Sequence, residues 1–179
     1  MSTHFDPHQF GVTLLECCIT CAVAAVAMSV AAPSFSEHVS KQRLILSAKQ
    51  FAHDLSFART EALRRQSTIA ISFDTSSAGS CYIIHTDTQG PCTCPSAGQV
   101  QCPDDAAIIK SAFFESGNDL RLSANVNVMR LDPYHATVTP TSSVTFAHGN
   151  RFAIVERVNV LGRVRTCAAI GHIAGHQPC

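Results

Sequence analysis

The apolar residues of the chain are concentrated near its N-terminus. From Val12 to Ala32 the sequence is almost continuously apolar and carries one charged residue, Glu16. A helix of roughly 20 apolar residues is long enough to cross a bilayer, and this stretch lacks the polar face of a helix that covers a soluble core. No basic residue precedes it and no small-residue cleavage site follows it. We therefore predict a retained membrane segment over residues 12–35 rather than a secretory signal peptide.

Beyond this segment, apolar residues recur every three or four positions, which is the period of an amphipathic helix. The apolar stripe consists of Leu44, Ala48, Phe51, Leu55, Ala58 and Ala62. Most basic residues of the same stretch fall on other faces, so we expect the stripe to pack on a sheet. The sequence thus predicts a helical continuation over 36–66, and a helix over 12–66 would be roughly 80 Å long.

After Gln66 the apolar residues alternate with polar ones and β-branched residues become frequent, which indicates strands. The expected strands are Thr68–Phe73, Cys81–His85, Leu120–Leu122, Val126–Leu131, Val144–Ala147, Phe152–Val158 and Arg163–Ile170. The expected turns or loops are Ser76–Ser80, Gln89–Gln101 and Pro140–Ser143. An amphipathic helix followed by many short strands predicts an α+β fold with an antiparallel, β-rich head over 67–179.

The sequence GVTLLE, Gly11 to Glu16, leads directly into the apolar helix. This motif resembles the processing site of type IV prepilins and type II secretion pseudopilins. The resemblance implies that a prepilin peptidase removes a leader over 1–11 by cutting after Gly11, and that Val12 becomes a methylated N-terminus. It also implies that Glu16 registers the subunits in the filament. The family usually has Phe in place of Val12, and its leader is usually basic, whereas this leader has no Lys or Arg.

Glu16 has other interpretations from the residues themselves. A charged side chain in hydrocarbon costs at least about 2–3 kcal/mol, so it is usually paired or functional. Its partner could be the free α-amino group left by cleavage after Gly11. A carboxylate in the first turn also suits the positive end of the helix dipole, and Glu16 could instead lie among the lipid headgroups.

The stretch Ser56–Asp74 and the strands that follow it resemble the FimT/GspH class of minor pilins and pseudopilins over essentially the whole chain. The resemblance implies a pilin-like fold, in which a long N-terminal helix packs on the β-rich head. It implies a single-pass inner-membrane protein with its head in the periplasm, which reaches the pilus or cell surface after assembly. Other pilins or pseudopilins would be its partners through the N-terminal helix.

The nine cysteines fall into two groups. Cys17, Cys18 and Cys21 lie in the apolar segment, where they act as small apolar residues. The head holds Cys81, Cys92, Cys94, Cys102, Cys167 and Cys179. In an oxidising periplasm these predict up to three disulfides. Proximity favours Cys167–Cys179 and two bridges among the other four, and strain disfavours Cys92–Cys94.

Zinc is the alternative for two groups of cysteines. Cys167, His172, His176 and Cys179 form one array of possible ligands, and Cys92, Cys94 and Cys102 form another. Neither spacing matches a common zinc module, so disulfides are favoured. We expect no metal and no cofactor, and no catalytic motif points to an enzyme.

The sequence GRVR, Gly162 to Arg165, is the candidate binding site. Arg163 and Arg165 are two residues apart, so on a strand both side chains leave the same face, and two guanidinium groups suit neighbouring phosphates. Arg157 could extend the site. The alternative is a solvated pair of arginines, or ion pairs with Glu156 and Asp132. FimT-type minor pilins of natural transformation carry a DNA-contacting G-R-x-R motif near the C-terminus, which GRVR resembles.

The formal net charge is zero, with 13 basic and 13 acidic residues, which excludes a protein that coats DNA with lysine. Without the leader and Glu16, the rest has two more basic than acidic residues. This slight excess predicts weak, salt-sensitive and sequence-independent DNA binding through phosphate contacts. The predicted function is a minor type IV pilin that binds DNA for uptake. The alternative is a structural subunit that primes a pilus or type II pseudopilus without binding DNA.

Overall fold

The computed structural model describes residues 13–87, 90–103 and 106–179, without the side chains of residues 30–34. The leader and the predicted processing site at Gly11 and Val12 lie outside the described residues. The chain divides into two compact units, Met1–Val39 and Ser40–Cys179. Each unit is described by itself below.

The helix α1, Leu14–Arg65, contains nearly all of the described part of the N-terminal unit and the first part of the second. At its start the backbone N–H of Glu16 donates a hydrogen bond to Oγ1 of Thr13, so Thr13 acts as an N-cap and Glu16 lies in the first turn. No helix among the described residues is both long and apolar enough to cross a membrane. The membrane segment over 12–35 remains a prediction.

In the second unit, the predicted apolar stripe of α1 forms one side of the core. Its six residues are at most 2% exposed, which confirms the stripe. They share one apolar cluster with residues of both large sheets. The ring of Phe51 lies 5.3 Å from that of Tyr82 and 6.0 Å from that of Phe146, so one side chain contacts strands of both sheets. Each such buried large side chain contributes about 1.5–3 kcal/mol.

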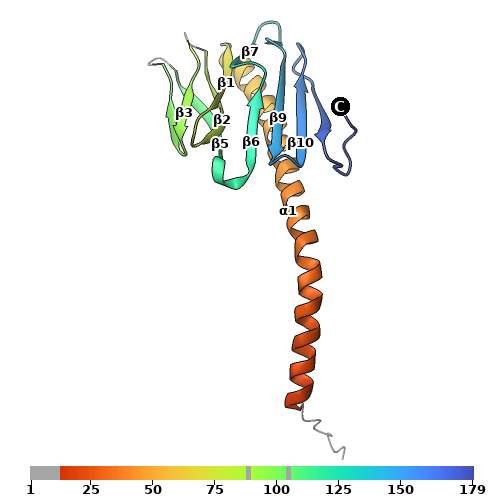
Figure 1. Ribbon diagram of the computed structural model, residues 1–179. Helices are drawn as coiled ribbons and strands as arrows, with labels where there is room; N and C mark the ends of the chain where they lie inside the picture. Colours follow the sequence, from red (N-terminus) through yellow and green to blue (C-terminus); the bar gives the residue numbers. More distant parts are fainter. Residues whose placement is uncertain (1–12, 88–89, 104–105) are drawn as a thin grey trace, which may run out of the picture. The chain divides into compact units, whose positions relative to one another are not determined.

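The head contains two antiparallel sheets and a separate two-stranded hairpin (Figure 1). The first sheet has the order β5-β2-β1-β7-β8, with bounds Ile108–Glu115, Gly79–Thr86, Ile69–Thr75, Val128–Asp132 and Thr137–Thr139. The second has the order β11-β10-β9-β6, with bounds Val164–Ile170, Phe152–Val158, Ser142–His148 and Leu120–Ala124. The short helix η1, Ser116–Asn118, precedes β6, and the hairpin pairs β3, Thr93–Ser96, with β4, Gln99–Gln101. The predicted α+β, antiparallel fold is confirmed.

Several local predictions were wrong. The stretch Gln89–Gln101 was expected to be a loop, yet its described part contains β3 and β4. The disulfide Cys81–Cys94 attaches this hairpin to β2 of the first sheet, and Cys92–Cys102 joins the two ends of the hairpin. These cysteines form a small apolar cluster with Ile83. These cross-links outweigh the Pro and Gly content that predicted a loop.

Strand boundaries also differ from those expected. β5 and β8 were not predicted. The stretches Ser76–Ser80 and Pro140–Ser143, expected as turns, already contain the first residues of β2 and β9. Arg163, expected inside a strand, lies one residue before β11.

A buried carboxylate joins α1 to the first sheet. The side chain of Asp54 is 1% exposed and accepts hydrogen bonds from Nζ of Lys110 at 2.7 Å, from the Tyr82 hydroxyl at 2.8 Å and from Nε2 of Gln50 at 2.8 Å. Burial raises the pKa of this carboxyl, but the hydrogen bonds from Lys110, Tyr82 and His53 and the charge of Lys110 together lower it by more, so its pKa lies below the usual range. Asp54 is therefore ionised and fixes the helix against β2 and β5.

Candidate nucleic-acid interface

The GRVR motif lies at the hairpin that joins β10 to β11. The two strands are antiparallel, with Arg157 directly opposite Arg165 and Val158 opposite Val164. Two backbone hydrogen bonds close the turn between them, from the N–H of Gly162 to the carbonyl of Asn159 and from the N–H of Asn159 to the carbonyl of Arg163. The side chain of Asn159 adds a third, because its Oδ1 accepts from the N–H of Arg163 at 2.8 Å.

Gly162 is required by the conformation and the packing of this turn. Its φ of +67° lies in the left-handed region that favours glycine. A Cβ at this position would lie 3.0 Å from Cδ of Arg59 on α1 and 3.1 Å from Cγ2 of Val138 on β8. The turn therefore lies closely against both elements.

Three arginines surround one open hollow at this hairpin. Arg157, Arg163 and Arg165 line it together with Thr141, Val158 and Asn159. All three arginines are exposed. Residues directly opposite each other in an antiparallel pair have Cβ atoms about 5 Å apart, so the like charges of Arg157 and Arg165 destabilise the free hairpin. An anion in the hollow would remove this repulsion.

The ion pairs that could neutralise these arginines do not form. Within the described residues, none of the three makes an ion pair. Glu156 is 1% exposed and accepts a hydrogen bond from the Thr166 hydroxyl at 2.8 Å. Asp132 accepts from Nδ1 of His135 at 2.7 Å and from the N–H of Tyr134 at 2.8 Å.

Burial gives Glu156 an unusual titration. Burial raises the pKa of its carboxyl, and the hydrogen bond from Thr166 lowers it by less, so the pKa lies above its usual range. The side chains of neighbouring strand residues point to opposite faces, so the buried Glu156 and the exposed Arg157 lie on opposite faces of β10. Glu156, the acidic residue next to Arg157 in sequence, therefore does not neutralise the arginines on the outer surface of the hairpin.

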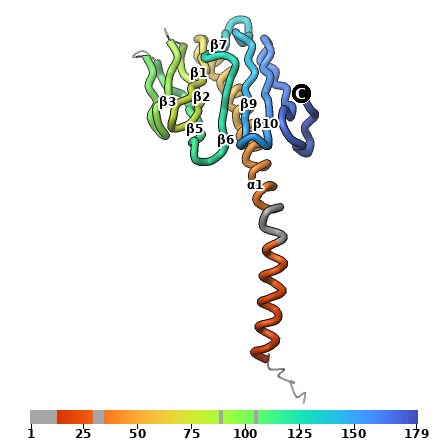
Figure 2. The backbone as a smooth tube through the Cα atoms, viewed as in Figure 1, coloured from red at the N-terminus to blue at the C-terminus, as the bar shows by residue number. Residues whose placement is uncertain are grey.

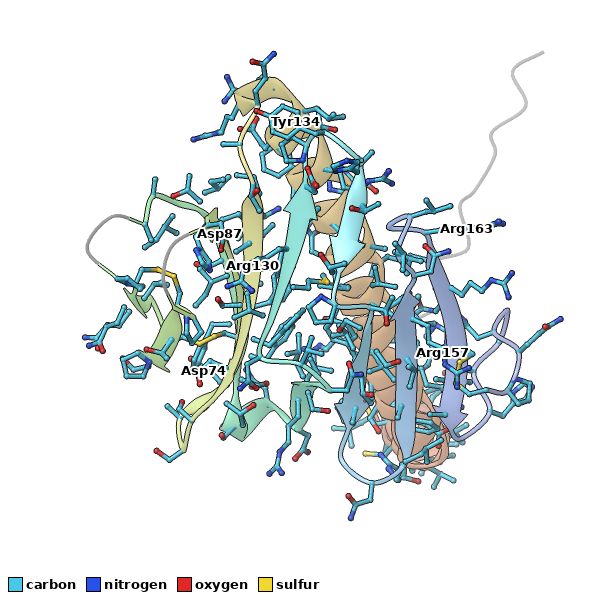
Figure 3. The ribbon with its side chains drawn as sticks, turned by 90° about the horizontal axis from the view of Figure 1, so that it is seen from above. Asp74, Asp87, Arg130, Tyr134, Arg157 and Arg163 are labelled. Atoms are coloured by element: carbon cyan, nitrogen blue, oxygen red, sulfur yellow. A yellow bond between two sulfur atoms is a disulfide. The ribbon has the colours of Figure 1, made fainter. Side chains whose placement is uncertain are left out.

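The outer face of the second sheet is positively charged at Arg157 and Arg165. It also carries Arg121 of β6, which pairs with Ala147 of β9 and is exposed. Glu156, which is buried, is the one acidic residue of β6, β9, β10 and β11. Figure 3 shows Arg157 and Arg163 on the opposite side of the head from Asp74 and Asp87. Asp87 pairs with Arg130 at 2.9 Å, so this carboxylate already has a basic partner on its own side of the head.

Arg59 is a basic residue near the site that sequence analysis did not single out. It lies on α1, roughly a hundred residues before the motif in sequence, and its side chain contacts the turn at Gly162. Among the residues that the structure describes, it forms no ion pair. Only the tertiary packing of α1 against the β10–β11 turn brings it there, so no local pattern could have revealed it.

The end of the chain is fixed beside β11. The disulfide Cys167–Cys179 joins the strand to the last residue. The N–H of Ala168 donates to the carbonyl of Gln177 at 2.8 Å, and the N–H of Cys179 donates to the carbonyl of Ala168 at 3.0 Å. In Figure 2 the blue tail turns back beside the last strand.

All six cysteines of the head form disulfides, as predicted, and Cys167–Cys179 is the pair that proximity favoured. The sulfurs of both proposed zinc arrays are therefore held in disulfides and offer no thiolate. Cys17, Cys18 and Cys21 are free and exposed. Asp74 lies beside the sulfurs of Cys81 and Cys94, and its Oδ2 accepts from the N–H of Cys94 at 2.8 Å.

One Ser–His pair occurs among the described residues, and it is buried. Oγ of Ser72 lies 2.7 Å from Nε2 of His85, and both residues are 0% exposed. Nδ1 of His85 is 2.8 Å from the carbonyl of Thr86, so Nδ1 carries the proton and Nε2 accepts from Ser72. The N–H of Cys92 donates to Oγ of Ser72 at 3.0 Å. This chain of bonds joins β1, β2 and the disulfide-linked segment, which is a structural role.

A helix that packs one apolar stripe on an antiparallel, β-rich head matches the pilin-like fold. The family model described as Type II transport protein GspH matches residues 47–162, and the chain belongs to this family. It is a minor pilin or pseudopilin of the GspH/FimT class, and this membership implies assembly with other pilins or pseudopilins.

Two crystal structures of the type IV minor pilin FimU from Pseudomonas aeruginosa strain PAO1 resemble the chain. One, in space group P21, is 16% identical with a TM-score of 0.51, and the match covers 69% of this chain and 87% of that one. The other, in space group P65, is 16% identical with a TM-score of 0.48 and covers 68% and 94%. The first likeness shows the shared fold. No curated protein matches the chain.

Proposed function

We propose that this minor pilin is incorporated into a type IV pilus and binds extracellular DNA for natural transformation. Arg163 and Arg165 contact phosphates, Gly162 shapes the turn and Arg157 contributes more weakly. The observation that carries the proposal is the placement of Arg157 directly opposite Arg165, with Arg163 on the same hollow and without acidic partners among the described residues. An arrangement of like charges that weakens the free protein suits a polyanionic ligand.

The N-terminal part of the proposal concerns processing and assembly. A prepilin peptidase cuts after Gly11 and Val12 becomes the mature N-terminus. The chain is then held in the inner membrane by residues 12–35 with its head in the periplasm. Glu16 registers the subunit in the filament. The position of Glu16 in the first turn of α1, where the helix dipole favours a carboxylate, supports this role.

A second candidate function has support of its own. The matching family is described as a type II transport protein, which favours a structural subunit that primes a type II pseudopilus or a pilus without binding DNA. In that case the arginine hollow has no nucleic-acid ligand, and the protein shows no DNA affinity at moderate salt.

DNA binding by the purified full-length chain in mild detergent distinguishes the two functions. We expect the double variant Arg163→Ala/Arg165→Ala to bind a duplex more weakly. The slope of log affinity against log salt should become shallower by roughly 0.7–0.9 for each phosphate that is no longer neutralised. The matched control is Arg64→Ala/Arg130→Ala, which removes the same charge from arginines that are paired with Glu61 and Asp87. Equal losses of affinity in both double variants, or none in the first, would contradict the site.

A further inference from the structure

The tip of the β10–β11 turn is apolar although the hairpin around it is basic. Val160 is 46% exposed and Leu161 is 64% exposed, and they are adjacent in sequence. Arg163 follows two residues after Leu161, and Arg157 precedes Val160 by three. Folding gains little from these two side chains, because much of their surface stays in water.

The turn holds the two side chains on a fixed backbone. The hydrogen bonds between Asn159, Gly162 and Arg163 close it. The carbonyl of Val160 also accepts a hydrogen bond of 2.7 Å from the N–H of Val138 on β8. Because the backbone is already ordered, a ligand that covers the tip pays little conformational entropy.

The charges around the tip limit what can cover it. The arginines suit a ligand with several negative charges, and Val160 and Leu161 suit an apolar surface between those charges. Duplex DNA offers this combination, since two phosphate backbones flank the stacked bases. Aliphatic side chains in DNA-binding proteins act as wedges that enter the minor groove and partly separate a base step, whereas single-stranded DNA is bound mainly by stacking on aromatic residues.

We infer that Val160 and Leu161 enter the minor groove of duplex DNA as an aliphatic wedge while the arginines of the same hairpin hold the phosphates. This inference rests on the proposed DNA-binding function and specifies how the duplex is bound. It adds a preference for deformable base steps, such as TA, without reading base edges. The protein remains able to bind many sequences.

The test compares Leu161→Ser with Leu46→Ser in the full-length protein. Leu46, on α1, is a matched control because it is 62% exposed, against 64% for Leu161. Two duplexes of equal length are used, one with central TA steps and one with a stiff A-tract. The fluorescence of 2-aminopurine placed at the central TA step reports unstacking, and thermal unfolding confirms that both variants are folded.

We expect Leu161→Ser to weaken binding to the TA duplex by about tenfold, which corresponds to partial burial of one leucine. It should also abolish the preference over the A-tract and the rise in 2-aminopurine fluorescence. The salt slope should not change, because the arginines still neutralise the same phosphates. Leu46→Ser should behave as the wild type.

Two results would overturn the inference. In the first, Leu161→Ser binds DNA with the affinity and the 2-aminopurine fluorescence of the wild type, while Arg163→Ala/Arg165→Ala still weakens binding. This result would contradict the wedge but not the proposed DNA-binding function. The other is an equal fall in affinity in Leu161→Ser and Leu46→Ser. Absence of DNA binding by the wild type contradicts the proposed function itself.

Discussion

Gly162 connects the apolar tip of the β10–β11 turn to the arginines of the motif. Its left-handed backbone and its contact with Arg59 both depend on the missing Cβ. Two separate features therefore require glycine at this position of GRVR: the local backbone conformation and the tertiary packing against Arg59. Only the local reason could be predicted from the sequence, because a glycine before two arginines suggests a turn but not a helix lying against it.

We predict that Gly162→Ala lowers the free energy of unfolding by about 1–2 kcal/mol and weakens DNA binding severalfold, because the new Cβ forces the turn or the side chains of Arg59 and Val138 to move apart. Urea unfolding and a DNA titration measure the two effects. Gly98→Ala is the matched control, since Gly98 has φ +75° and nothing within 4 Å of its Cβ position. It should lose similar stability and retain DNA affinity. Equal DNA affinity in both variants would contradict a role for Gly162 in the site.

At the scale of elements, helix α1 and the first sheet are joined by apolar packing and by the buried Asp54. The apolar packing could be predicted from the sequence, because a stripe of apolar residues with helical period is visible without knowing what it packs against. The ion pair of Asp54 with Lys110 could not be predicted. Asp54 and Lys110 are 56 residues apart, and β5, which carries Lys110, was not predicted.

We predict that Lys110→Met lowers the free energy of unfolding by about 2 kcal/mol, because Asp54 remains buried and charged without its closest cationic partner. The double variant Asp54→Asn/Lys110→Met should recover part of this loss, since it removes both charges. Chemical unfolding of both variants measures the recovery. A double variant less stable than Lys110→Met would show that the charge of Asp54 has another source of stabilisation.

Most strands of the head, but not all of them, could be predicted from the sequence. β1, β2, β6, β7, β9, β10 and β11 overlap the predicted strands, because alternation marks one buried face. The hairpin β3–β4 was missed since its order depends on Cys81–Cys94 and Cys92–Cys102, and the pairing of these four cysteines was open in the sequence. The arginine site was predicted from GRVR, but the opposition of Arg157 and Arg165 requires the register of the hairpin.

At the scale of the whole molecule, stability depends on pH through groups in different parts of the head. Burial lowers the pKa of His85, and the hydrogen bond to the Thr86 carbonyl opposes this without reversing it. The folded protein therefore binds this proton less readily than the unfolded chain. Its contribution to stability is present above the ordinary pKa, about 6.5, and is lost as the pH falls. Glu156, whose pKa is raised, acts in the opposite direction.

We predict that the wild type exceeds His85→Gln in stability by more at pH 7.5 than at pH 5.5. Taking the difference between the two proteins removes the contribution of Glu156, which both contain. The midpoints of urea unfolding of both proteins at the two pH values measure this difference in stability. An equal difference at both values would mean that the buried imidazole is not the titrating group.

The return of the C-terminal tail has a further consequence for how copies of this protein meet. β11 is an edge strand, and an uncovered edge can recruit a strand from another molecule. The tail occupies both backbone groups of Ala168, and the disulfide Cys167–Cys179 keeps it there. This part of the edge is closed to strand exchange, so another molecule cannot add a strand to β11 at Ala168.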